Sequence, residues 1–276
     1  MKHSTRVLTA ILTFVGLWTC GSSTHAGVVP LPPPGPARIA KADAVIVGTV
    51  EALEPQDMKV GNMTYRIAVV RINQGIKGTK NAKTLRIGFV PLEMPNPKIR
   101  PGIRPVQLKA GQEGIFILAK HATENFYTIG GVVGYYINSD MNKEFEKEVQ
   151  AAKAAAKVAD NPLAALKAKD ADERLLGAAV LIERYRTFRP NAKQEPIDAE
   201  ESKLILQALG DADWQTTWNF TSLRVHPQQL FGRLGVSAKD GFTIPKGVNY
   251  QAAAQAWVRE NAQKYRIQRF VAGEEK

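Results

Sequence analysis

The chain has 276 residues and a formal net charge of +11, with 37 lysines and arginines against 26 aspartates and glutamates. Its single cysteine, Cys20, lies near the N-terminus, so the rest of the chain can form neither disulfides nor thiolate metal sites and needs a hydrophobic core for stability. This length is enough for one large domain or two ordinary ones.

The N-terminus reads as a secretory signal peptide. A short positive segment precedes an apolar run at 7–18. A membrane-spanning helix needs roughly 20 apolar residues, so this run fits a signal peptide better than a span, and no later run is long enough to cross a bilayer. Small residues before and at Ala26 form a cleavage site, so we expect 1–26 to be removed. Two positive charges leave with them, and the exported chain, periplasmic or secreted, keeps a net charge of +9.

A lipid anchor is the alternative for the same segment. The residues around Cys20 have the outline of a lipoprotein cleavage box, in which the cysteine thiol is acylated. The bulky Trp18 and Thr19 fit that box badly. We therefore expect Cys20 to be discarded with the signal peptide.

Residues 27–40 begin with a proline-rich stretch. Repeated proline fixes φ and favours an extended polyproline conformation, so this segment is predicted to be a stiff tether.

The next part of the chain, 41–138, shows the pattern of a β-domain. Five short segments are rich in β-branched or aromatic residues and bounded by Gly, Pro or Asn, at 44–53, 63–72, 84–90, 113–119 and 126–137. In the third, Leu85, Ile87 and Phe89 alternate with Arg86 and Gly88, which places one face on a core and the other toward solvent. The run 115–118 is apolar on both faces and predicts a central strand. A small five-stranded β-barrel follows.

From residue 139 the apolar period changes to that of helices. The first predicted helix begins at a cap at Ser139 or Asp140 and runs through Phe145 to Ala159. The others are a restart after Asn161, then 172–188, 199–209, 214–223, 227–234 and 250–270. Core packing is the default reading of Trp214 and Trp218, although exposed rings could stack on sugars. The fold class is therefore α+β, with an all-α domain at 139–272 after the barrel.

The β-domain resembles the OB barrel of netrin domains and tissue inhibitors of metalloproteinases. The similarity rests on the strand-and-turn patterns 41–50, 65–72 with the turn 75–78, and 108–118. It supports a fold more than an activity. The inhibitors of that family chelate a protease zinc through an N-terminal cysteine, which the mature chain lacks.

The helical domain resembles a short stack of HEAT-type helical pairs. Residues 165–185 carry the most repeat-like pattern, and 202–214 form a weaker second copy. The resemblance implies a surface for a protein partner.

No catalytic constellation is found in the sequence. His121 and His226 are far apart and have no metal-ligand spacing, and no nucleophile elbow occurs. The turn at 75–80 lacks the spacing of a phosphate loop, and it joins two strands, unlike the helix-linking loop of a KH domain. We expect no enzymatic activity, cofactor, metal or nucleic-acid partner.

The most distinctive stretch is the long connection at 91–105, in which Ile-Arg-Pro occurs twice. Long loops inside compact domains are often functional. Proline would hold the backbone extended and present four cations, Lys98, Arg100, Arg104 and Lys109, to an anionic partner. A plain solvated loop is the alternative.

The sequence thus predicts an exported interaction protein that binds a protein or an acidic envelope polymer. A hydrolase or protease inhibitor using the barrel rim is the alternative function.

Overall fold

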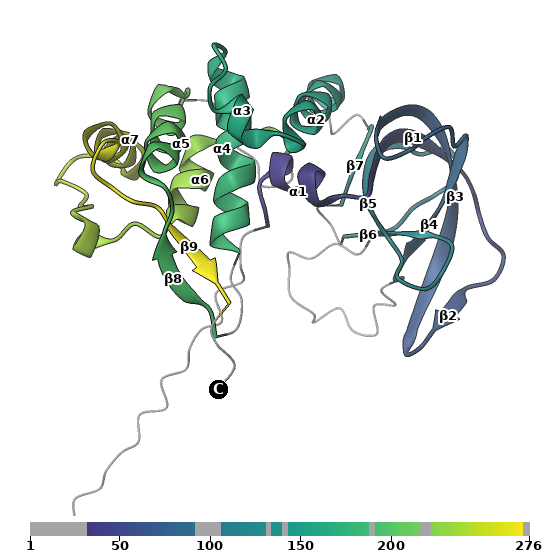
Figure 1. Cartoon of the computed structure of the whole chain (residues 1–276). Coiled ribbons are helices and arrows are strands. Elements are labelled where there is room, and N and C mark those ends of the chain that lie inside the picture. The colour runs from purple at the N-terminus through teal and green to yellow at the C-terminus, as the bar shows by residue number, and fades with distance from the viewer. Residues whose placement is uncertain are drawn as a thin grey trace, which may run out of the picture. The chain divides into compact units, whose positions relative to one another are not determined.

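The computed structural model describes residues 32–91, 106–130, 134–139, 143–187, 191–215 and 222–272. The segment Pro32–Lys276 forms one compact unit (Figure 1). The expected signal peptide and most of the long cationic connection, including Lys98, Arg100 and Arg104, lie outside the described residues. The fold is mixed α+β, as the sequence predicted.

Five strands form a ring of hydrogen-bonded pairs. They are β1 (Ala44–Leu53), β3 (Met63–Lys77), β4 (Thr84–Phe89), β5 (Glu113–Lys120) and β6 (Tyr127–Ile129). β1 pairs with β3, β3 with β4, β6 with β5, and β5 again with β1, all antiparallel, whereas β4 and β6 are parallel. Register shifts along the β1–β3 pairing allow the strands to bend. Two short strands, β2 (Met58–Val60) and β7 (Tyr135–Ile137), extend the sheet from β3 and β5.

The central strand was predicted correctly. β5 pairs with β1, β6 and β7, and both of its faces are buried. Phe116 and Leu118 join the core on one face of the sheet with Ile87, while Ile115 and Ile117 pack on the other. β1 alternates in the same way, because helices cover its second face.

A short helix stands where an extended tether was expected. α1 (Gly35–Lys41) has Pro36 in its first turn, where the missing N–H costs no hydrogen bond. Ala37 and Ile39 are buried, and Ile39 belongs to a core shared with β1, β5 and α2. Burial of these apolar residues outweighs the preference of the preceding prolines for an extended chain.

Most of the helices predicted for the second part form, with some shifts in their ends. They are α2 (Phe145–Ala159), α3 (Pro162–Ala165), α4 (Ala171–Arg186), α5 (Ala199–Asp211), α6 (Pro227–Leu234) and α7 (Tyr250–Asn261). The helix predicted at 214–223 is not among them, because 214–215 and 222–223 are not helical and 216–221 lie outside the described residues. Polar side chains cap several of them, including Asn161 on α3 and Asp170 on α4, as expected for helix starts. α4 packs against α2, α3, α5 and α6, while α5 packs against α7.

The last predicted helix is shorter than expected. α7 ends at Asn261, and the chain continues into β9 (Gln268–Val271), which pairs with β8 (Lys193–Pro196). Between them Ile267 is fully buried, and its N–H donates to Ser202 Oγ. Trp214 is buried too, with its indole N–H on the Leu209 carbonyl, whereas Trp218 lies outside the described residues.

Candidate functional site

An aromatic cluster lies beside the outer face of β3 and β4, at the connection between β5 and β6. Tyr65 on β3 is 5.2 Å from Phe126 and 5.6 Å from His121, measured between ring centroids, and the last two rings are 4.6 Å apart. Phe126 is buried, whereas Tyr65 and His121 are partly exposed. The cluster thus presents two rings to solvent on a buried aromatic base.

Gly88 makes room for this cluster. A Cβ at this position would lie 2.5 Å from the ring of Phe126 and 3.3 Å from Ile67 Cδ1. Leu85, Ile87 and Phe89 face the core as predicted. Gly88 was expected to face solvent, but Phe126 covers it, because a strand without a side chain leaves space for a ring to lie on the backbone.

Arg86 joins the two connections that border the cluster. Its guanidinium makes two hydrogen bonds to the carboxylate of Glu54, at 2.7 and 2.9 Å, and a third to the carbonyl of Asn125. The hydrogen bond from Arg86 lowers the pKa of Glu54, and the same bond raises that of Arg86. Glu54 follows β1 and Asn125 precedes β6, so Arg86 fixes both loops relative to β4.

Of the predicted cationic site, the structure describes only Lys109. Lys109 is exposed in a turn before β5, where its N–H donates to Gln112 Oε1. His121 follows the other end of that strand. Lys109 therefore lies at the opposite end of β5 from the aromatic cluster.

His121 and His226 both stabilise local structure. Nδ1 of His121 accepts hydrogen bonds from the N–H groups of Thr123 and Glu124, which shapes the β5–β6 connection. His226 caps α6, because its Nδ1 accepts a hydrogen bond from the N–H of Gln228. From the sequence, His121 has no aromatic neighbour. Tyr65 and Phe126 come to lie beside it only because β3 pairs with β4 and β4 pairs with β6.

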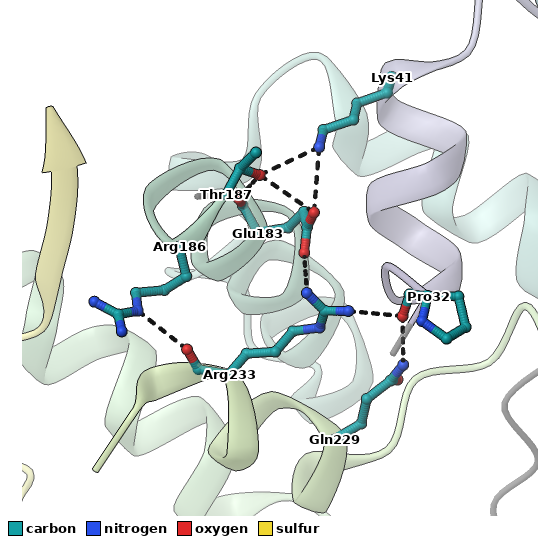
Figure 2. A network of polar contacts seen from close by, with 7 residues as sticks. All are labelled: Pro32, Lys41, Glu183, Arg186, Thr187, Gln229 and Arg233. Atoms are coloured by element: carbon teal, nitrogen blue, oxygen red, sulfur yellow. Dashed lines mark hydrogen bonds and ion pairs between the residues drawn. The ribbon is translucent and has the colours of Figure 1, made fainter. Parts of the chain in front are cut away.

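A second polar cluster surrounds Glu183 on α4 (Figure 2). One carboxylate oxygen accepts from Arg233 at 2.7 Å, and the other accepts from Lys41 and Thr187, both at 3.2 Å. Arg233 also donates to the carbonyl of Pro32 at 2.7 Å. Two cations and a hydroxyl thus contact this carboxylate. Together these contacts anchor α1 and the residues just before it to the helices α4 and α6.

A third cluster anchors the other side of α1. Glu148, on α2, is buried and accepts from Ser222 Oγ at 2.7 Å and from the N–H of Leu223 at 2.5 Å. Arg38 donates to the Ser222 carbonyl. Burial lowers the pKa of Arg38 to about 10, against the opposing effect of the negative charge on Glu148. These contacts fix the buried arginine and so anchor α1 to α2 and to the segment at 222–223.

Neither anchor offers a site for a metal. Within the described ranges no group of three or more His, Cys, Asp or Glu residues is placed to hold a metal ion. In the same part of the chain no helix is both long and apolar enough to cross a membrane.

Compared with known protein families and with curated proteins, the chain shows no match.

Proposed function

We propose that the chain is an exported, non-enzymatic interaction protein that binds an acidic polymer of the cell envelope through its β-domain. In this proposal 41–138 is an OB-type barrel and 139–272 is a HEAT-like helical stack. The ring of five paired strands supports the first part, since the OB fold is a five-stranded Greek-key barrel. The consecutive packing of α3, α4 and α5 supports the second.

The observation that carries this function is the aromatic face with Arg86 at its border. OB folds bind oligosaccharides and oligonucleotides on the face of their second and third strands, between the loops after the first and fourth. Here those strands are β3 and β4, and those loops contain Glu54 and His121. Partly exposed rings suit stacking on a sugar, and Arg86, held by Glu54 and Asn125, fixes the loops that border them.

The distribution of charge favours an anionic partner. Residues 41–138 contain 13 lysines and arginines against 7 aspartates and glutamates, a net charge of +6, whereas 139–276 carry 21 against 19. Most of the +9 of the mature chain therefore belongs to the β-domain. Such a charge raises the rate of encounter with a polyanion and makes binding sensitive to salt.

Titration calorimetry with polygalacturonate, and with neutral dextran as the matched polymer, tests the proposal. We expect binding to polygalacturonate alone, and a loss of about five- to tenfold in Tyr65→Ser, which removes one ring. The variant Lys167→Glu/Lys169→Glu reverses two exposed charges outside the β-domain and serves as the control. Equal binding of both polymers, or an unchanged Tyr65→Ser, would contradict the proposal.

The cationic connection is tested separately. The triple variant Arg100→Glu/Arg104→Glu/Lys109→Glu is expected to weaken polygalacturonate binding if this segment contributes to the site. A pull-down from envelope extract distinguishes a protein partner. A protein retained by the original chain and by Tyr65→Ser, but lost with the triple variant, would assign the connection to a protein partner instead of the polymer.

A further inference from the structure

Exposed apolar side chains gather on the loop between the short 3-10 helix η2 (Ala238–Asp240) and α7. Among the described residues six large hydrophobic side chains are well exposed, and three of these lie within seven positions. They are Ile244, Val248 and Tyr250, with exposed fractions of 51%, 40% and 37%. Scattered exposed residues are ordinary on a protein surface, but such a concentration on one loop is not.

The tip of this loop is a β-turn with a cation at its centre. The N–H of Val248 donates to the Pro245 carbonyl at 3.0 Å, and Gly247 has a φ of 84°, which its lack of a Cβ allows. Lys246 is exposed between them. The turn therefore carries Lys246 with an exposed aliphatic residue on either side, Ile244 and Val248.

The base of the loop is fixed. The rings of Phe242 and Tyr250 lie 5.0 and 6.1 Å from that of the buried Phe231, between centroids. Trp257 Nε1 donates to the Asp240 carbonyl at 3.0 Å. The packed aromatic base thus keeps the aliphatic side chains at the tip exposed to solvent.

The charge of the loop is positive. Residues 241–259 contain no aspartate or glutamate, and Lys239 lies just before them. The neighbouring acid, Asp240, accepts hydrogen bonds from both the N–H and the hydroxyl of Ser237. A partner surface that complements this tip must carry negative charge in its outer layer and apolar groups directly below that layer.

We propose that this loop docks the protein on a membrane containing anionic lipids. Ile244 and Val248 insert among the headgroups, Lys239 and Lys246 contact lipid phosphates, and Tyr250 lies at the interface, where tyrosine is enriched. Three side chains on one loop are too few for a typical protein interface, which buries about 800 Å² on each partner. Peripheral proteins are commonly held on membranes by two weak interactions together, namely shallow insertion of apolar side chains and attraction of basic residues to anionic lipids.

Co-sedimentation of the mature chain with lipid vesicles tests this inference. We expect binding to vesicles of phosphatidylcholine with phosphatidylglycerol, and little to phosphatidylcholine alone. Ile244→Ser/Val248→Ser is expected to weaken binding about tenfold or more, and Lys246→Glu about tenfold. The exposed Leu163, on α3, provides the control variant Leu163→Ser, which keeps full binding.

A dye on the loop gives a second readout. The mature chain lacks cysteine, so an environment-sensitive dye on Thr243→Cys reports the loop alone, and its emission should shift to the blue with anionic vesicles. The same dye on Lys167→Cys should not shift. Absence of vesicle binding, equal loss in Leu163→Ser, or no shift at position 243 would overturn the inference. Because Tyr65→Ser leaves this loop intact, failure here is distinguishable from failure of polymer binding.

Discussion

Arg233 on α6 connects Glu183 on α4 to the start of the described chain: one of its terminal nitrogens donates to the Glu183 carboxylate, and the other donates to the Pro32 carbonyl. Both residues of the ion pair have largely buried side chains. The pair therefore fixes two helices and the segment before α1 with one set of contacts.

Replacing this carboxylate should destabilise the fold. Glu183→Gln keeps the shape but leaves Arg233 and Lys41 without their counter-charge, which we expect to cost about 2 to 3 kcal/mol in the free energy of unfolding. Urea denaturation measures it. Glu200→Gln breaks an exposed pair with Lys203 and should change stability by less than about 0.5 kcal/mol. Equal effects of the two substitutions would show that the buried pair is no anchor.

α1 should contribute to stability as part of the core. Ile39 is fully buried, and Ile39→Ala should lower the free energy of unfolding by about 3 kcal/mol through lost burial and a cavity. The exposed Ile244 supplies the control, since Ile244→Ala should cost less than about 0.5 kcal/mol. An extended tether predicts no loss for Ile39→Ala, so unfolding curves distinguish the two descriptions.

Gly88 should be intolerant of any side chain. Gly88→Ala forces the ring of Phe126 away, and overpacking of this kind costs about 1 to 3 kcal/mol. The displaced ring should also disturb Tyr65 and weaken polygalacturonate binding. At Gly130 a Cβ meets nothing within 4 Å, so Gly130→Ala is the matched control. Thermal melts and calorimetry of both variants check the two effects.

The protein should lose stability at alkaline pH. Burial, followed by a 2.5 Å hydrogen bond to Glu201, raises the pKa of Tyr185 in the folded chain. As the pH rises above about 10, Tyr185 ionises first in the unfolded chain. The stabilisation present below that pH is then lost progressively, up to the folded pKa. Urea denaturation at pH 9 and pH 11 should show a smaller decrease for Tyr185→Phe, and identical decreases would contradict the assignment.

The sequence predicted elements whose pattern is local. β1 has the expected bounds, and α4 and α6 begin within one residue of their predicted starts, because alternation, apolar period and caps lie within each segment. β8 was missed, since its polar sequence has no alternation. It is ordered by pairing with β9, 78 residues away at the Lys193–Val271 pair. Such pairings are invisible to a local reading.

The candidate site was missed for a related reason. Tyr65 and Phe126 belong to separate segments, and nothing local indicates that Gly88 lets them meet. The alternation around Arg86 correctly placed this residue off the core face, which was the one available signal. The expected cationic site depended on the length and the prolines of the connection at 91–105, and Lys109, its described member, lies in a turn before β5.

The partners of α1 also determine when it can dock during synthesis. Lys41 and Arg38 in this helix, and Pro32 just before it, make hydrogen bonds with residues that lie 142, 184 and 201 positions later in the chain. A ribosome releases these partners last, so the paired strands can close long before the helix is fully anchored. The apolar side of Ile39 can pack on β1, β5 and α2 once these have been made, whereas the polar contacts that anchor α1 form only when the second half of the chain has emerged. A chaperone that recognises a loosely held N-terminal helix would have its longest opportunity in that interval.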